Sequence, residues 1–541
     1  MLDLDRIEGD FRPSEDGKFA EAGNCMISTA HPLATSAGVE ILRQGGNAVD
    51  AACAAALALS VCEPQASGIG GQTMMLIYTG RKIIALDGSS RAPSLAHVSA
   101  LYEEDRSLGY RATTVPSTLA VLGYAHSRYG SLPWAVICEP AIRIAYEGYP
   151  ITELQSRLQE KELESFHRVE SFSGGRYFLK EGKPYRPGEI FKQPDLGGLL
   201  EDVARNGFTY FYRGRPARMI DADMRQNGGL LRYDDLALIP LPIERKPVSG
   251  SFRGLRIYTM PPPGAGRPLV YALHMFDAVP PEELHRDRIA RTHLLVEVIR
   301  EALLEWTGRP YDPNFYPQIP PERMLSREYA RKVIRRIAAS IDIHLPIRET
   351  YDERSGETTH LSVMDGKGMV VSLTQSIEKV YGSKAAAEGL GFLYNNYLED
   401  FDYRKVDHPY YLRPNSVPWA SVAPTIVFLD DTPWLALGSP GSERIFSVLT
   451  QFLMNVIDLD MSMDKAVREP RIHSSLGGKV SLEADRIGRD VLEYLQREGY
   501  RIDRREAYSF YLGSVHAVLR KRRGGFQGVA DVRRDGTAGG F

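Results

Sequence analysis

Residues 356–376 read GETTHLSVMDGKGMVVSLTQS and lie two-thirds of the way along the chain. The flanking segments 358–365 and 369–376 are rich in apolar and β-branched residues, and the sequence GKG between them is typical of a tight turn. The stretch is therefore predicted to form two paired strands. Thr358 and Thr359 open the first strand, directly after a polar, turn-prone run.

Helix and strand signals alternate along the rest of the chain. The apolar spacing predicts helices, and short apolar runs that meet at turn residues predict strand pairs. The predicted helices cover 31–46, 47–61, 117–148, 288–306, 445–457 and 489–499, and the predicted strand pairs cover 73–90, 424–442 and 514–532. The helix at 47–61 is apolar almost all round, whereas 288–306 reads as amphipathic. Strand pairs flanked by buried helices indicate a layered α/β architecture with antiparallel sheets.

The composition is that of an ordinary globular protein. The 541 residues are 43% hydrophobic and 25% charged, and the formal net charge of -3 gives no electrostatic footprint for nucleic acid. The basic clusters 331–336 and 520–523 are interpreted as solvated faces of a helix and a hairpin. The longest apolar run, 51–62, is too short to span a bilayer. The N-terminal residues do not resemble a secretory signal, so no membrane partner and a cytoplasmic location are expected.

Neither a metal nor a cofactor is expected from the sequence. The four cysteines have no metal or redox spacing and are predicted to be buried free thiols: Cys25, Cys53, Cys62 and Cys138. No cluster of ligand-type residues is visible. The adjacent acids Glu399 and Asp400 resemble a carboxylate pair, but neighbours on a strand point to opposite faces.

The threonine at position 358 suggests a specific chemistry. A threonine hydroxyl is a weak nucleophile at neutral pH and needs a base. If the peptide bond between Glu357 and Thr358 is cut, Thr358 gains an α-amine with a pKa near 8, which can take the hydroxyl proton. The alternative is that Thr358 and Thr359 are only β-formers at a strand start. His360 is interpreted as structural, because such a nucleophile uses its own amine.

Residues 358–376 closely resemble the processing site of the γ-glutamyltranspeptidases, a family of N-terminal nucleophile hydrolases. Further segments resemble other blocks of that family in the same order: 45–76, 86–93, 391–401, 417–427 and 435–445. The resemblance implies a four-layer αββα sandwich of the α+β class. It also implies self-cleavage into a large subunit, 1–357, and a small subunit, 358–541, which fold together as one unit.

Several family site residues carry over directly. The resemblance places Thr358 on the nucleophile, and Ser376 where a threonine hydroxyl supports it. Arg91 falls on the arginine that binds the substrate α-carboxylate, and Asp400 on the aspartate that binds the α-amine. A guanidinium and a carboxylate form a strong charge-assisted pair.

Other positions depart from the family pattern. Gly441 and Ser442 replace the Gly-Gly pair of the oxyanion hole, but backbone N–H donors survive a change of side chain. Ser421 matches one of two carboxylate-binding serines, whereas Ala420 stands at the other position. Two further positions that normally help hold the substrate amine are changed, with Glu378 in place of asparagine and Tyr397 in place of glutamine or glutamate.

The resemblance therefore implies an amidohydrolase or acyltransferase that cleaves γ-glutamyl amides such as glutathione. The segment between Asp400 and Ser421 is shorter than in members with a lid, which favours water over an acceptor amine. Two alternatives remain. One is an acylase that acts on another amide, such as a cephalosporin side chain or a small dicarboxylic amide. The other is an unprocessed, inactive member that serves as a binding scaffold.

Overall fold

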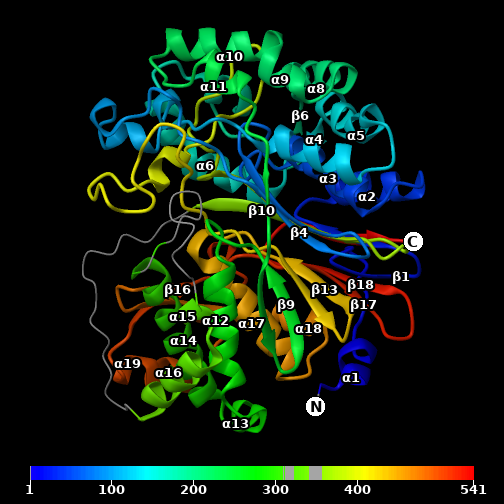
Figure 1. Ribbon diagram of the computed structural model, residues 1–541, viewed down its shortest axis with the longest axis vertical. Helices are drawn as coiled ribbons and strands as arrows, with labels where there is room; N and C mark the ends of the chain where they lie inside the picture. Colours follow the sequence, from blue (N-terminus) through cyan, green and yellow to red (C-terminus); the bar gives the residue numbers. More distant parts are fainter. Residues whose placement is uncertain (1, 309, 311–321, 340–355) are drawn as a thin grey trace.

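Two seven-stranded sheets lie face to face at the centre of the molecule (Figure 1). A computed structural model describes residues 2–308, 310, 322–339 and 356–541. The strand orders are β1-β18-β17-β13-β12-β9-β8 in the first sheet and β19-β2-β10-β11-β3-β4-β7 in the second. All neighbours within these two sheets are antiparallel. The predicted αββα sandwich is confirmed.

The strands of the two sheets come from all parts of the chain. The first sheet contains β1 (Phe19–Ala22), β8 (Val248–Phe252), β9 (Leu255–Thr259), β12 (Thr425–Leu429), β13 (Thr432–Gly438), β17 (His516–Arg520) and β18 (Phe526–Ala530). The second contains β2 (Met26–Thr29), β3 (Gln72–Tyr78), β4 (Ile83–Gly88), β7 (Ile243–Arg245), β10 (Glu357–Met364), β11 (Val370–Glu378) and β19 (Thr537–Gly540). Smaller pairings join β5 (Tyr149–Pro150) to β6 (Ile190–Phe191), and β14 (Ile472–Ser474) to β15 (Lys479–Glu483) and β16 (Arg501–Arg505).

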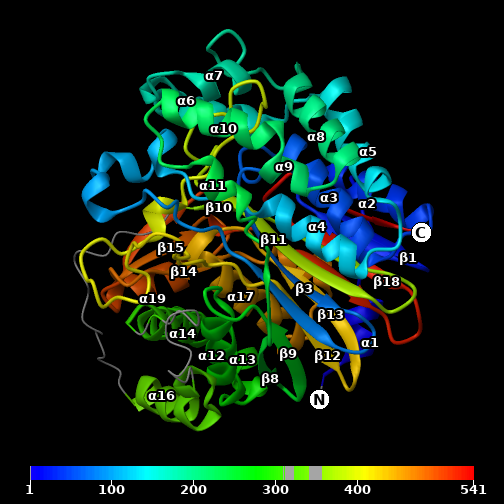
Figure 2. The same ribbon diagram turned by 45° about the horizontal axis from the view of Figure 1, so that its top comes forward.

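Helices cover the outer faces of both sheets (Figure 2). The upper layer in Figure 1 lies over the second sheet and contains α2 (Pro32–Arg43), α3 (Ala48–Cys62), α4 (Thr118–Tyr129), α5 (Trp134–Glu147), α6 (Glu153–Arg168), α7 (Ser173–Phe178), α8 (Pro194–Asn206), α9 (Thr209–Arg213), α10 (Arg215–Gln226) and α11 (Tyr233–Ala237). The lower layer contains α12 (Gly266–Asp277), α13 (Pro281–Arg286), α14 (Arg288–Gly308), α15 (Glu322–Leu325), α16 (Arg327–Ala339), α17 (Ile445–Ile457), α18 (Met463–Arg468) and α19 (Arg489–Arg497), and α1 (Leu4–Gly9) lies near the N-terminus.

The sequence patterns explain why these elements form. Every side chain of α3 is buried, as its all-round apolar sequence predicts, and Asn47 caps its N-terminus. The hairpin of β10 and β11 turns at Gly368, whose φ of 91° lies in the left-handed region that glycine adopts without strain. The other three predicted strand pairs also form, as β3–β4, β12–β13 and β17–β18.

One helix departs from its prediction. The expected amphipathic helix at 288–306 is α14, but its residues Leu295–Leu303 are buried without a break. One side of α14 packs in the main core, and Val296 packs with the small sheet of β14 to β16 and with α19. Glu297, Arg300 and Glu301 are therefore enclosed. The charged side chains that make this helix look solvent-exposed in the sequence are instead covered by neighbouring elements of the fold.

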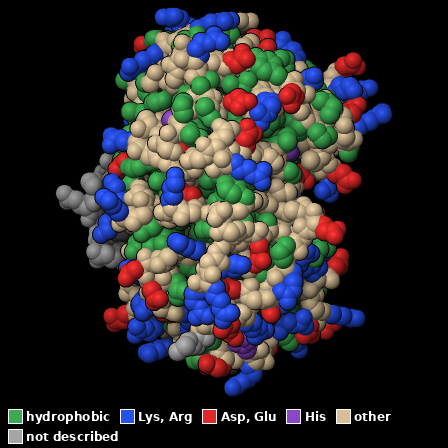
Figure 3. Space-filling model, turned by 90° about the vertical axis from the view of Figure 1, so that its right-hand side faces the viewer, with side chains coloured by type: hydrophobic (Ala, Val, Ile, Leu, Met, Phe, Trp, Pro, Cys, Tyr) green, Lys and Arg blue, Asp and Glu red, His purple; other side chains and the backbone are tan. Residues whose placement is uncertain are grey.

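The buried thiols and the exposed basic face of a helix agree with the expectations from composition. All four cysteines are buried free thiols. The basic cluster 331–336 lies on α16, where its charged side chains are exposed and Val333 and Ile334 are buried. Within the part of the chain that the structure describes, no helix combines the length and apolar character that crossing a membrane requires. The surface in Figure 3 intersperses acidic and basic side chains.

Candidate active site

Thr358 lies at the start of β10, in the middle of the second sheet. Glu357 pairs with Glu378 and Thr359 pairs with Gln375, so Thr358 of β10 faces two residues of β11, Ser376 and Ile377, across a β-bulge of β11. A bulge leaves one residue out of the ladder and re-aims its side chain. Thr358 is only 3% exposed. Thr358 is therefore shielded from solvent, at the point where the pairing between β10 and β11 is irregular.

Ser376 contacts the peptide group that precedes Thr358. The Ser376 Oγ donates a hydrogen bond of 2.5 Å to the carbonyl oxygen of Glu357. The backbone N–H of Glu378 donates to the same Oγ at 2.8 Å. Since the hydroxyl accepts from that N–H, its own proton is directed at the Glu357 carbonyl. A donor on a carbonyl oxygen stabilises the negative charge that forms when a nucleophile attacks the carbon.

The side chain of Glu357 is also fixed. Its Oε1 accepts from the backbone N–H of Thr358 at 2.9 Å and forms an ion pair with Arg534. Arg534 is 1% exposed and also lies 3.9 Å from Glu63. Burial raises the pKa of Glu63 to about 8, despite the nearby guanidinium. The sequence analysis missed Arg534 and Glu63 because each lies far from Thr358 along the chain and in no recognisable motif.

The turn after β13 contains Gly441 and Ser442, and it lies beside Gly356. The φ angles of 127° at Gly441 and 53° at Ser442 turn the backbone sharply into the short 3-10 helix η5 (Ser442–Arg444). A Cβ on Gly356 would lie 3.2 Å from the Ser442 Oγ and 2.4 Å from the Glu378 Oε1. Among the described residues, no backbone hydrogen bond uses the N–H of Gly441 or Ser442. Both donors remain available for an oxyanion.

Tyr397, Glu378 and Asp400 form the next part of the site. Burial raises the pKa of Tyr397, and the nearby carboxylates of Glu378 and Asp400 act in the same direction. Tyr397 and Asp400 lie in one 3-10 helix, η4 (Tyr397–Asp400), and both are buried. The expectation of a strand at Glu399 and Asp400 is wrong, but the two acids do face different surroundings. Glu399 forms an ion pair of 2.6 Å with Lys379.

Arg91 and Ser421 approach from two other segments. Ser90 donates from its backbone and its hydroxyl to Gln72, at 2.8 and 3.1 Å, and Gln72 pairs with Ser376 across β3 and β11. Arg91 is thereby tied to the site, and its half-buried side chain makes no hydrogen bond or ion pair to any residue that the structure describes. Ser421 is buried and follows Trp419, which lines a small cavity together with Asp400.

His360 is structural, as expected. It is fully buried, and its ring nitrogens lie 2.8 Å from the Thr374 hydroxyl and 3.0 Å from the Ser362 hydroxyl. The ring also fills the space beside Gly438 of the opposite sheet. Burial holds the pKa of His360 well below its usual value, so the ring is neutral. Within the described residues, no group of acidic, histidine or cysteine side chains is arranged to hold a metal ion.

Comparison with known proteins agrees with this geometry. The family profile described as "Gamma-glutamyltranspeptidase" matches residues 34–541. The chain belongs to the γ-glutamyltranspeptidase family. Membership makes it an enzyme of the hydrolase and transferase type, with the N-terminal nucleophile hydrolase fold.

The similar members of the family have two kinds of name. The glutathione hydrolase proenzyme of Escherichia coli (strain K12) is 31% identical, over 95% of this chain and 91% of that protein. The acylase ACY 1 proenzyme of Pseudomonas sp. (strain SE83) is 32% identical, over 96% of this chain and 94% of that protein. The crystal structure of a cephalosporin acylase from Bacillus halodurans superimposes with a TM-score of 0.87 at 28% identity, over 98% of both chains.

Proposed function

We propose that this family member is a self-processing amidohydrolase with Thr358 as its nucleophile. The observation that carries the proposal is the 2.5 Å hydrogen bond from Ser376 to the Glu357 carbonyl, beside the bulge at Thr358. This hydrogen bond activates the bond that a self-cleaving precursor must break. The same hydroxyl then stays next to the nucleophile after cleavage.

Self-cleavage begins at the Glu357 carbonyl. The Thr358 hydroxyl attacks the carbonyl carbon, and the C–N bond breaks as the amide nitrogen of Thr358 takes up a proton. The resulting ester joins Glu357 to the Thr358 oxygen, and water hydrolyses it to a carboxylate and the free hydroxyl. The products are the fragments 1–357 and 358–541. Thr358 then carries the α-amine that can serve as its base.

The sheet topology supports a heterodimer of the two fragments. In the second sheet, β2 and β3 belong to the first fragment, whereas β10, β11 and β19 belong to the second. In the order β19-β2-β10-β11-β3, the first fragment's β2 lies between strands of the second fragment, and the pair β10–β11 lies between strands of the first. Separating the fragments would break three ladders of backbone hydrogen bonds in this sheet, β19–β2, β2–β10 and β11–β3, so the cleaved chains stay together.

For the mature enzyme we propose γ-glutamyl amides, such as glutathione, as substrates. Arg91 binds the α-carboxylate, and Asp400 with Glu378 binds the α-ammonium. Thr358 attacks the amide carbonyl, and the N–H groups of Gly441 and Ser442 stabilise the oxyanion. The amine leaves, and water releases the acyl group from Thr358. The short segment after Asp400 favours water over an acceptor amine.

A second candidate is an acylase that acts on a different acyl group. Tyr397 and Ala420 both depart from the family pattern at the end of the pocket that would bind the amino-acid part of the substrate. Tyr397 is buried beside Glu378 and Asp400, where it takes up space that a smaller polar side chain would leave open. The names of the acylase relatives are consistent with this alternative. The third candidate, an uncleaved binding scaffold, gives no role to the hydrogen bond on the Glu357 carbonyl.

Two measurements separate the candidates. Intact mass and a denaturing gel should give fragments 1–357 and 358–541, and a chain that stays intact would leave only the scaffold. The hydrolysis rates of γ-glutamyl-anilide and glutaryl-anilide should then be compared, since glutaryl-anilide keeps the distal carboxylate and lacks only the α-amine. We expect the γ-glutamyl compound to react faster. Equal or faster cleavage of the glutaryl compound would favour the acylase.

A further inference from the structure

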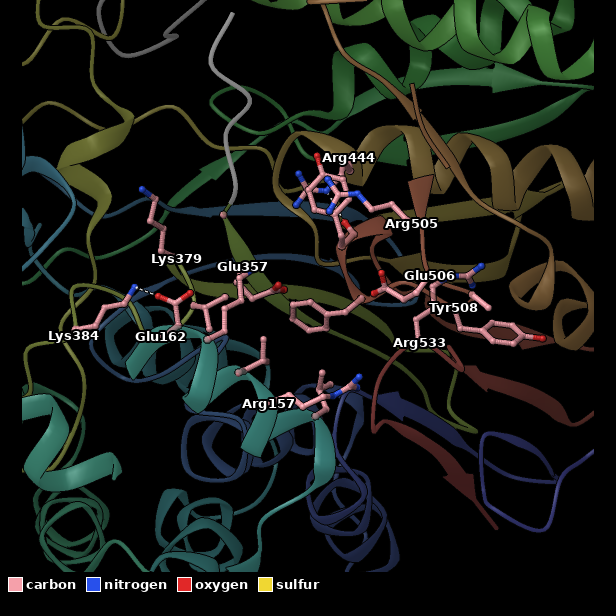
Figure 4. Close-up of a pocket in the computed structure, with 18 residues that line it drawn as sticks. Arg157, Glu162, Glu357, Lys379, Lys384, Arg444, Arg505, Glu506, Tyr508 and Arg533 are labelled. Atoms are coloured by element: carbon pink, nitrogen blue, oxygen red, sulfur yellow. Dashed lines mark hydrogen bonds and ion pairs between the residues drawn. The ribbon is translucent and has the colours of Figure 1, made fainter. Parts of the chain in front are cut away.

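A cavity separate from the candidate active site lies in the lower helical layer. Its walls come from α14, α17, β14, α19 and the loops that follow α18 and β15, and we call it the α14–α17 cavity. Its volume of about 350 Å³ suits a small ligand. Figure 4 shows the cavity that reaches Glu357, and within the described part of the chain the two cavities share no lining residue.

The α14–α17 cavity is well removed from the oxyanion turn. It is lined by Asn455 near the end of α17, whereas η5 directly precedes Ile445 at the start of that helix. At the rise of an α-helix, these two residues lie about 15 Å apart along its axis. Arg486 lines the α14–α17 cavity, and its guanidinium carbon lies 3.9 Å from the ring centroid of Tyr508, which lines the cavity in Figure 4. These two stacked side chains therefore separate the cavities.

Arginines from three elements line the α14–α17 cavity, and two of them are already neutralised. Arg288 pairs with Asp490 at 2.7 Å, and Arg486 pairs with Glu483 at 2.6 Å. The third, Arg291, belongs to α14 like Arg288 and lies one helical turn further along. The charge that a ligand would meet therefore depends mainly on Arg291 and on the polar side chains next to it.

Arg291, Glu469 and Asn455 have polar groups that no contact uses. The half-buried Arg291 donates to the Leu284 carbonyl at 2.5 Å, which uses one of its five N–H donors. The Glu469 carboxylate and the amide of Asn455, which is 9% exposed, make no hydrogen bond or ion pair within the described residues. Burial lowers the pKa of Arg291, and the nearby Glu469 carboxylate acts in the opposite direction. A cation and an anion therefore line the same cavity without forming an ion pair.

We propose that the α14–α17 cavity binds a free α-amino acid with an apolar side chain. The ligand carboxylate pairs with Arg291, the ligand ammonium pairs with Glu469, and the Asn455 amide donates to the first or accepts from the second. The ligand side chain contacts the apolar part of the wall, formed by Leu295, Met454, Ile472, Ile487 and Val491. A simple anion would be repelled by Glu469 and a simple cation by Arg291, so a zwitterion suits this wall best.

Calorimetric titration of the wild-type protein with L-leucine tests this site. Two analogues are the matched ligand controls: 4-methylpentanoate is leucine without its ammonium, and 3-methylbutylamine is leucine without its carboxylate. We expect L-leucine to bind and each analogue to bind at least about tenfold more weakly, because each loses one charge-assisted contact. The titration involves no turnover, so its result does not depend on the proposed function.

Variants locate the bound amino acid. Arg291→Met and Glu469→Gln should each weaken L-leucine binding at least about tenfold. Arg286→Met and Glu493→Gln are the matched controls, because both side chains are exposed and neither lines the α14–α17 cavity. Arg91→Ala should also leave L-leucine binding unchanged, since Arg91 belongs to the candidate active site. Glu469→Gln keeps the shape of a side chain that has no partner, so it tests the site even if Arg291→Met does not fold.

Three outcomes would overturn the inference. The first is that L-leucine does not bind to the wild-type protein. The second is that 4-methylpentanoate binds as tightly as L-leucine, which would make the α14–α17 cavity a site for simple anions. The third is that binding is lost in Arg91→Ala and kept in Glu469→Gln, which would place the amino acid in the active site instead.

Discussion

The start of β10 and the segment 397–421 both contribute to the candidate active site, but different forces hold them. At the nucleophile end, formed by Glu357, Thr358, Ser376 and Arg534, the contacts are backbone ladders, a buried ion pair and a hydroxyl fixed by an N–H group. At the substrate end, formed by Arg91, Tyr397, Asp400 and Ser421, the groups are side chains from a loop, a 3-10 helix and an isolated bridge.

This difference explains where the sequence departs from the family pattern. A change at the nucleophile end takes a partner away from buried polar groups such as the Glu357 carboxylate, which is costly. A change at the substrate end alters the shape and charge of a pocket without breaking a ladder. The departures Tyr397 and Ala420 fall at the substrate end, whereas Thr358 and Ser376 keep their hydroxyls. Specificity can therefore vary while the cleavage machinery is retained.

The largest expected effect is that of Thr358→Ala. The variant lacks the attacking oxygen, so it should remain a single chain and lose at least about 10⁴-fold in kcat. Thr359→Ala is the matched control, since Thr359 is the next residue on β10 and is equally buried. The control should still give two bands on a denaturing gel. Cleavage of Thr358→Ala at the same bond would assign the nucleophile to another residue.

The second prediction concerns the ion pair at the nucleophile end. Arg534→Met would leave the buried carboxylate of Glu357 without its cation, at a cost of about 3–5 kcal/mol in the free energy of unfolding. Denaturant unfolding in an uncleavable Thr358→Ala background measures it. Arg523→Met, whose arginine side chain is 86% exposed, should change stability by less than about 0.5 kcal/mol. Similar values for both variants would contradict a special role for Arg534.

The third prediction is a pH dependence at the same end. Burial raises the pKa of Glu63 from 4.5 to about 8, so the folded protein holds this proton more tightly than the unfolded chain. The resulting stability is complete below pH 4.5 and is lost as the pH rises through about 8. Glu63→Gln should remove a fall on the order of 5 kcal/mol across this window.

The control for this pH dependence is Glu493→Gln, because Glu493 is 56% exposed on α19. Its curve of unfolding free energy against pH should overlay that of the wild type. If the Glu63→Gln curve also overlays the wild type, the folded protein does not hold Glu63 protonated.

The fourth prediction moves to the substrate end. Arg91→Ala should weaken transition-state binding of γ-glutamyl-anilide by about 2–4 kcal/mol, because one charge-assisted contact is lost. The measured quantity is the corresponding fall in kcat/KM. Cleavage into 1–357 and 358–541 should proceed as in the wild type, and Arg91→Lys should recover part of the activity. A variant that fails to process, with unchanged substrate binding, would make Arg91 a structural residue.

The smallest expected effect comes from adding a hydroxyl. Ala420→Ser would place a second serine next to Ser421 and should raise kcat/KM for γ-glutamyl-anilide by about 1 kcal/mol, roughly fivefold. The rate with 4-aminobutyryl-anilide, which keeps the amine and lacks the α-carboxylate, is the internal control and should not change. A parallel rise for both compounds would show that position 420 does not contact that carboxylate.

The sequence by itself determined most of the elements, and it predicted Thr358 as the nucleophile. Periodicity and turn residues are local properties, so α3, the hairpin of β10 and β11, and the pair β12–β13 were all predictable. Six ordered segments also sufficed to indicate the family. The same local patterns misjudged α14, because Glu301 pairs with Arg336 of α16 and Glu297 accepts from Tyr500, contacts that only the folded chain supplies.

Only the tertiary structure decided what surrounds the threonine. Arg534 reaches Glu357 from the far end of the chain, and Glu63 faces that arginine from the end of α3. The spacing of residues along the sequence does not predict these contacts of Arg534, because they depend on which strands become neighbours. The same holds for the α14–α17 cavity. Arg291 and Glu469 are far apart in the sequence, and the fold alone places them in the wall of one cavity.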